Sequence, residues 1–183
     1  MMRSCTLTIA AVAMTFGTLS VHADDDDKRQ VVTASFGAGL NTAAAANHHI
    51  MPQQIRVRRG GVVNFNVAGF HQIMVYKPGN TPDDIRAFIA ANDPTNAAVF
   101  INRLNTPDNP DNLRYTGINP ANLANLAGAN PATPPAPVTR SNLGNRIESV
   151  AFLEPGRYLV ICNVRGHFQD GMFAWVRVDE DDD

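Results

Sequence analysis

The chain has 183 residues, with 15 Lys and Arg against 17 Asp and Glu, 5 His, 2 Cys and a formal net charge of −2. The acidic residues concentrate in two terminal runs, residues 24–27 and 179–183, so the body between them is mildly basic. This weak charge, without any nucleic-acid-binding motif, argues against a nucleic-acid partner.

The first 23 residues have the pattern of a secretory signal peptide. Arg3 precedes an apolar run that closes with small residues at Ala23. The run is too short to span a bilayer comfortably, so we expect cleavage near Ala23 and no membrane span in the mature form. The protein is then periplasmic or secreted, and residues 24–30 form an acidic linker whose DDDDK sequence also matches an engineered protease site.

Short runs with a two-residue period predict β-strands. Val63, Phe65 and Val67 fall on one face of such a run, and asparagines fall on the other. Comparable runs are VVTASF, QIRVRRG, HQIMVY, ESVAFLEPG, GRYLVIC and MFAWVRV. Runs of this kind separated by Gly and Pro turns are typical of an all-β sandwich. We therefore predict a single domain over residues 31–178, followed by an acidic tail at 179–183.

A region rich in Pro, Asn and Ala, at about residues 78–146, interrupts this β pattern. It contains three capping residues that each stand before a proline, which predicts three helix starts: Thr81, Asp93 and Asn119. After the first start, Ile85, Phe88 and Ile89 would line one helix face. We expect a partly helical insertion packed on the sandwich, with a disordered linker as the alternative.

The sequence CNVRGHFQDGM carries three potential metal ligands. Cys162 ends one predicted strand, Met172 begins the next, and His167 lies in the turn between them, so a hairpin would bring the three side chains together. Two imidazole nitrogens, one thiolate and a weak axial thioether suit copper in electron-transfer sites. The alternative is a buried core cysteine beside an ordinary turn histidine.

A second nitrogen ligand should come from another strand. His71 stands at the start of the predicted strand HQIMVY and can face the same end of the sandwich. His48 and His49 could bind a second metal, but adjacent side chains on an extended chain point to opposite sides, so we interpret them as a solvent-facing turn. The predicted ligand set is His71, Cys162, His167 and Met172.

These motifs resemble those of the cupredoxins, the small type 1 blue copper proteins. The resemblance lies in the Cys-x4-His-x4-Met loop, in GFHQIMVY around the first histidine and in MPQQIRVRRGGVVNFNV ahead of it. The ligand-loop spacing is most similar to rusticyanin-type and phytocyanin-type loops. The resemblance covers about residues 31–76 and 147–178, and implies a cupredoxin-like Greek-key sandwich with one type 1 copper ion.

Two positions depart from the family pattern. Gln72 stands where an asparagine often follows the first histidine, and Asn163 stands where a hydroxyl residue often follows the cysteine. In the family these positions help to tie the two ligand loops together. We expect this amide pair to replace that tie.

The resemblance implies an electron carrier and not an enzyme. Its partners would be redox proteins such as a c-type cytochrome or an oxidase subunit, and His167 would be the ligand nearest to them. An apolar rim for docking would consist of Phe70, Phe168 and Phe173. Copper storage or delivery is the alternative, suggested by HHIM alone. A copper enzyme is disfavoured because the chain lacks the His-x-His ligands of catalytic copper sites.

Overall fold

The computed structural model describes residues 30–37, 45–104, 112–121 and 145–180. In chain order its elements are β1 (Val31–Phe36), the 3-10 helix η2 (Ala45–Asn47), β2 (Ile50–Met51), β3 (Gln54–Arg58), β4 (Val62–Val67), β5 (Ile73–Tyr76), α1 (Pro82–Asn92), β6 (Leu113–Thr116), β7 (Arg146–Ala151), β8 (Gly156–Cys162), α3 (Arg165–Gln169) and β9 (Phe173–Asp179). The predicted signal peptide lies outside the described residues. Within them, no helix is both long and apolar enough to cross a membrane.

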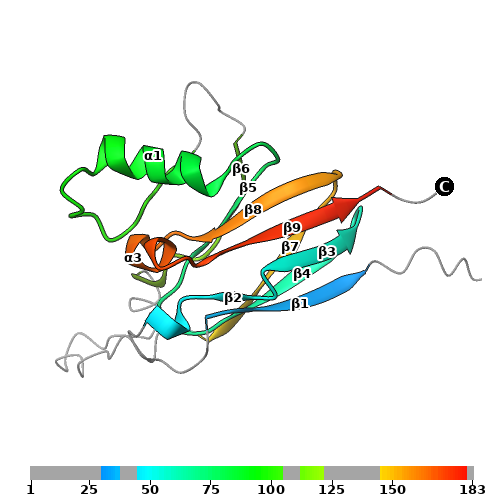
Figure 1. The fold of residues 1–183 in the computed structure, drawn as a ribbon. Coiled ribbons are helices and arrows are strands. Elements are labelled where there is room, and N and C mark those ends of the chain that lie inside the picture. The colour runs from blue at the N-terminus through cyan, green and yellow to red at the C-terminus, as the bar shows by residue number, and fades with distance from the viewer. Residues whose placement is uncertain (1–29, 38–44, 105–111, 122–144, 181–183) are drawn as a thin grey trace, which may run out of the picture.

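The strands form two sheets that face each other as layers of a sandwich (Figure 1). One sheet has the order β2-β1-β4-β7, and the other has the order β3-β9-β8-β5-β6. Both sheets are mixed, because β1 pairs in parallel with β4 and β3 pairs in parallel with β9. Successive strands pass repeatedly from one sheet to the other, as in Greek-key sandwiches. The predicted all-β sandwich with a partly helical insertion is confirmed.

The main core lies between the sheets and follows the predicted alternation. Val63, Phe65 and Val67 of β4 are buried, while Asn66 between them is exposed. Ile55 and Val57 of β3 are buried in the same cluster. The period-two pattern therefore places the right side chains in the core.

A second apolar cluster covers the outer face of the β5–β8 region, where α1 lies across the sheet (Figure 1). Its members are Met74, Tyr76, Ile85, Ile89, Ile101, Leu159, Ile161 and Phe168. All four residues of β5 are buried, because this strand has an apolar cluster on each face. The insertion thus adds a third layer over the strands that lead to the cysteine.

The first predicted helix start is confirmed. Thr81 is the N-cap of α1, accepts a bond from the Asp84 N–H and forms a capping box with the Asp84 side chain, and Pro82 opens the helix. Ile85 and Ile89 are buried as expected, whereas Phe88 is only partly buried against the second cluster.

The second predicted helix start is wrong. Asp93 closes α1, and its carboxylate accepts from the N–H groups of Ala97 and Ala98, so it organises a turn instead of a helix. At the third site Asn119 accepts from the Ala121 N–H, and the rest of that predicted helix lies outside the described residues.

Two further details differ from the predicted boundaries. The insertion contributes a strand, β6, which pairs with β5 and was not predicted. Strand β9 continues one residue into the predicted acidic tail, because Asp179 pairs with Arg58 of β3. The rest of the tail from residue 181 lies outside the described residues.

Candidate metal centre

The loop between β8 and β9 brings the predicted ligands to one end of the sandwich. Cys162 is the last residue of β8, and its N–H donates to the carbonyl of Met172 at 3.1 Å. The Met172 N–H in turn donates to the His167 carbonyl at 3.0 Å. The main chain therefore closes this loop around its three potential ligands.

His167 lies on a helical turn instead of the predicted hairpin turn. The short helix α3 spans Arg165–Gln169, and its first turn is closed by the Phe168 N–H on the Val164 carbonyl. The eleven-residue stretch from Cys162 to Met172 has room for a helical turn, which a two- to five-residue hairpin loop would lack. The prediction of a simple turn was therefore wrong in its local conformation.

His71 reaches the same point from the loop before β5. Ile73, the first residue of β5, pairs directly with Cys162 in the second sheet, so His71 lies just beyond the cysteine on the loop that leads into β5. The His71 ring is buried and packs edge-on against Phe36 of the first sheet. Both sheets therefore fix this imidazole.

Three ligand atoms converge at the end of the sandwich. The Cys162 Sγ lies 3.6 Å from the His71 Nδ1 and 3.7 Å from the His167 Nδ1. The two imidazole Nδ1 atoms lie 2.9 Å apart. All three atoms lie within 4.8 Å of one another, the spacing of a group that could hold a metal ion.

The two sulfur–nitrogen separations fit a small ion at the centre of the group, whereas the 2.9 Å between the two imidazole nitrogens is shorter than the about 3.3–3.6 Å that the same geometry gives. An ion about 2.0–2.1 Å from nitrogen and about 2.3 Å from sulfur, with bond angles near tetrahedral or trigonal, would set nitrogen and sulfur about 3.5–3.8 Å apart. The two measured sulfur–nitrogen distances have this length. Two imidazoles and one thiolate are also the donor set that suits copper in electron-transfer sites. The residues present therefore fit a copper ion.

Burial keeps the thiol protonated when no ion is bound. Cys162 is fully buried, and this burial raises the pKa of its thiol to about 12. The backbone N–H groups of Gln72 and Val164 donate to the sulfur and act in the opposite direction, as does the charge of Arg146. These donors already point at the position where a thiolate charge would develop.

The two imidazoles are held neutral. Burial, followed by the neighbouring His167, lowers the pKa of His71 to about 3. Burial, followed by the neighbouring His48, lowers the pKa of His167 to about 4. Neutral imidazoles keep a free lone pair for a metal at physiological pH, which is the form that coordination requires.

The Met172 side chain is fully buried within the main core cluster. Its backbone lies opposite Cys162, at the start of the last strand. An axial thioether contact from Met172 stays a prediction. Because the thioether is a weak ligand, it would tune the site more than hold the ion.

The expected amide pair joins the two ligand loops. The Asn163 Nδ2 donates to the Gln72 Oε1 at 2.7 Å, and the Asn163 N–H donates to the Gln72 carbonyl at 2.8 Å. Gln72 also donates to the Gly117 carbonyl at 2.9 Å, and the Asn163 Oδ1 accepts from the Asn102 N–H at 2.9 Å. Both amides are buried with these partners, so they fix His71 and Cys162 relative to each other.

The predicted apolar rim is only partly at the surface. Phe168 is fully buried in the second cluster, because α3 turns its ring towards the outer face of the sheet. It cannot form part of a docking surface in this structure. Phe173 is partly buried against the same cluster, and Phe70 is partly exposed beside Phe100, with 5.9 Å between ring centroids.

His48 belongs to the site, which contradicts its interpretation as part of a solvent-facing turn. Only 8% of it is exposed, and its ring stacks on His167 with centroids 3.7 Å apart. Its Nδ1 lies 2.6 Å from the Asp170 Oδ2, while neighbouring His49 is partly exposed. A period of two from buried Ile50 would have placed His48 inward, a signal that the sequence contained.

The insertion also holds α3, the helix that carries His167. Arg165, the first residue of α3, makes an ion pair of 2.5 Å with Asp93 and donates to the Asn96 carbonyl. Both charged side chains of this pair are mostly buried. The turn that replaced the predicted second helix is therefore the anchor for the helix that carries His167.

No protein-family model matches the sequence, and no curated protein matches it significantly. Among solved structures, the chain is similar to a dithionite-reduced auracyanin from Roseiflexus castenholzii, with 15% identity over 82% of this chain and 97% of that chain and a TM-score of 0.44. It is similar to auracyanin A, a "blue" copper protein from Chloroflexus aurantiacus, with 16% identity over 81% and 98% of the two chains and a TM-score of 0.45. It is also similar to plastocyanin from Dryopteris crassirhizoma, with 12% identity over 81% and 100% and a TM-score of 0.39. At these values the likeness has no bearing on the chemistry of the site.

Proposed function

We propose that the chain is an exported, mononuclear type 1 copper protein that transfers single electrons between redox partners. The observation that carries the proposal is the convergence of the Cys162 sulfur with the Nδ1 atoms of His71 and His167, 2.9 to 3.7 Å apart. Copper, when bound, alternates between its +1 and +2 states and so takes up and releases one electron.

The surrounding residues favour a rigid, dry site. Cys162 ends a strand in the middle of its sheet and is held by the strand pairing, and His71 lies beside it on the adjoining loop with its ring packed against Phe36. The amide pair Gln72 and Asn163 joins these two segments again. A fixed ligand set limits the change of geometry between the two oxidation states, which favours rapid electron transfer.

Partial exposure distinguishes His167 from the other two ligands. His71 and Cys162 are buried, whereas His167 is only partly buried. Partly exposed Phe70 and Phe100 lie on loops at this end of the sandwich. A small apolar surface of this kind suits a weak redox encounter, with a c-type cytochrome or an oxidase subunit as the proposed partner.

Electron carriage fits the site better than catalysis or copper delivery. An enzyme needs an open coordination position, and delivery favours exposed Met and His ligands that release the ion easily. The potential delivery ligand His48 is buried against His167 instead. The proposed carrier is exported by its N-terminal segment, which N-terminal sequencing of secreted protein would test.

The absorption and electron paramagnetic resonance spectra of the Cu(II)-loaded protein test the proposal. We expect an intense visible thiolate-to-copper band and one copper ion per chain. Cys162→Ser should remove the band and keep a folded sandwich, because no disulfide depends on Cys162, which is a free thiol. His49→Ala is the matched control and should keep the band. The copper assignment would be wrong if the Cu(II)-loaded parent protein lacked the thiolate-to-copper band, or if Cys162→Ser kept it.

A further inference from the structure

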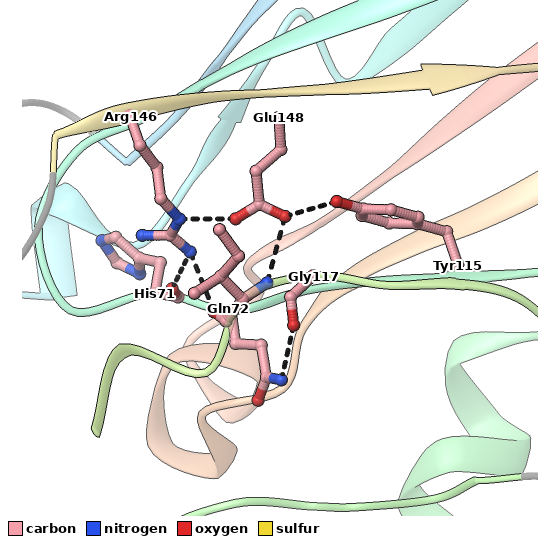
Figure 2. Close-up of polar contacts among 7 residues, drawn as sticks. His71, Gln72, Tyr115, Gly117, Arg146 and Glu148 are labelled. Carbon is pink, nitrogen blue, oxygen red and sulfur yellow. Dashed lines mark hydrogen bonds and ion pairs between the residues drawn. The ribbon is translucent and has the colours of Figure 1, made fainter. Parts of the chain in front are cut away.

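Two charged residues occupy inward positions of β7 at the end where His71 lies (Figure 2). Arg146 and Glu148 alternate on the same face as the core residue Val150, where the strand pattern calls for apolar side chains. The Arg146 Nε lies 2.5 Å from the Glu148 Oε1, and the two side chains are only 11% and 2% exposed. Burying an ion pair is costly, and apolar residues of similar size are often as stable or more so. The pair therefore calls for an explanation other than stability.

Arg146 binds the loop that carries His71, and both ends of the pair bind the chain at or just after β6 (Figure 2). The Arg146 Nη2 donates to the His71 carbonyl at 2.8 Å and to the Ile118 carbonyl at 3.1 Å. The Glu148 Oε2 accepts from the Tyr115 hydroxyl at 2.8 Å and from the Ile118 N–H at 3.3 Å. The insertion segment that includes Ile118 is thereby joined to the loop of the first histidine.

The neighbouring glycine fits this arrangement. A Cβ on Gly117 would overlap the Glu148 carboxylate. The Gly117 carbonyl also accepts the Gln72 side-chain amide, as Figure 2 shows. The chain thus approaches the buried carboxylate closely at the point where it supports Gln72.

One peptide group connects Arg146 to the cysteine sulfur. The carbonyl of His71 accepts from Arg146, and the N–H of the same peptide belongs to Gln72 and donates to the Cys162 sulfur. A cation on the oxygen side of a peptide polarises it and strengthens the hydrogen bond that its N–H donates. The positive charge therefore acts at the sulfur through two consecutive hydrogen bonds.

We propose that Arg146, balanced by Glu148, is a positioning residue that holds and polarises the His71–Gln72 peptide and so raises the reduction potential of the bound copper. This inference rests on the proposed function of the site. A fixed positive charge favours the oxidation state with the lower total charge, which is the reduced one. Glu148 limits this effect and keeps the arginine in place.

The test compares the reduction potentials and visible bands of copper-loaded variants with those of the parent. We expect Arg146→Met to lower the potential and to shift the band, because the Gln72 N–H···S bond weakens. Glu148→Gln should raise the potential, because the cation is then unbalanced. The double variant should lie between the two single variants. Arg146→Lys keeps the charge and should stay closer to the parent than Arg146→Met.

A second readout needs no copper. Hydrogen exchange of the metal-free protein should be faster over residues 70–76 in Arg146→Met and Arg146→Lys, because neither side chain can reach both carbonyls and the carboxylate together. The control is Arg177→Met, which removes one charge from an exposed pair with Asp179 on β9. That control should change neither readout.

The outcomes separate this inference from the proposed function. A parent protein without a thiolate-to-copper band overturns the function and this inference with it. The inference alone is overturned if the parent has the thiolate-to-copper band but Arg146→Met, Glu148→Gln and Arg177→Met all have the same reduction potential as the parent. If Arg146→Met does not fold, Glu148→Gln still tests the inference. The inference predicts a higher reduction potential for this variant, so a lower or unchanged potential contradicts it.

Discussion

His48 stacks on His167, with ring centroids 3.7 Å apart and ring planes inclined by 24°. The His48 Nδ1 also meets the carboxylate of Asp170, the residue that closes α3. The stack and the contact with Asp170 together join the segment before β2 to the helix that carries a proposed ligand. His48 therefore limits the freedom of the His167 ring although its own nitrogen is not among the three that converge.

Replacing His48 should disturb this ring without removing copper. We expect His48→Ala to lower the free energy of unfolding by about 1–3 kcal/mol, since an aromatic pair and a hydrogen bond each contribute about 0.5–1.5 kcal/mol. His48→Phe keeps the stack and loses the Asp170 contact, so its free energy of unfolding should lie between those of the parent and of His48→Ala. Denaturant titration and the visible band measure the effects, with His49→Ala as control. Loss of the copper itself in His48→Ala would mean that His48 is a ligand.

Substitutions of Met172 should tune the potential. We expect Met172→Gln to lower the reduction potential and Met172→Leu to raise it, both with copper retained, because an axial group tunes the potential while the other three ligands hold the ion. Voltammetry and metal analysis measure the two effects. Equal potentials in the parent and both variants would show that the Met172 thioether makes no axial contact.

Copper uptake should release about one proton over a wide pH range. Above about pH 5 both imidazoles are already neutral, because the pKa values of His71 and His167 are lowered to about 3 and about 4. Below about pH 9 the Cys162 thiol keeps its proton, because its pKa is raised to about 12. Only the thiol proton is displaced between these limits, so the apparent affinity should rise about tenfold per pH unit.

Calorimetry in buffers of different ionisation enthalpy counts these protons. Cys162→Ser, loaded under the same conditions, should release none at neutral pH. Release of about two protons at pH 6 would mean that one imidazole is still charged there, contrary to the burial of both rings.

Two positions on α1 test how the insertion packs. Ile85 is fully buried, so Ile85→Ala should cost about 2–5 kcal/mol of unfolding free energy. Phe88 is only partly buried, so Phe88→Ala should cost less than the about 3–5 kcal/mol expected for a fully buried phenylalanine. Denaturant midpoints measure both costs, with the visible band as a check on the copper site. Equal costs, or none at Ile85, would show that α1 is not held on the sheet in the way described.

The sequence predicted those strands, buried faces and helix starts that depend on residues close together in the chain. The alternation around Phe65 gives its strand and its buried face, and the capping box at Thr81 gives the start of α1. The convergence of His71, Cys162 and His167 could be expected because His71 and Cys162 stand beside or at strand ends and His167 lies in the loop that joins β8 to β9. Such signals need only neighbours along the chain.

Features that depend on distant partners were missed or misread. His48 is buried because His167 and Asp170 cover it, and both lie over a hundred residues further along the chain. Phe168 is buried because α3 aims it at a cluster that the insertion completes. The Asp93–Pro94 sequence fits a helix start equally well, but Arg165 and the Ala97 N–H use that carboxylate instead. Tertiary packing decided each case.

The strand that carries Cys162 is buried on both faces from Tyr158 to its end at Cys162. Tyr158 and Val160 point into the main core, while Leu159 and Ile161 point into the second cluster beneath α1. Such a segment should exchange its amide hydrogens only when a whole layer detaches, so we expect the cysteine amide to be among the slowest to exchange in the part of the chain that the structure describes. The environment of the proposed copper site can then be altered from two independent directions. A substitution under the insertion could change the site as effectively as one between the sheets, without touching a ligand.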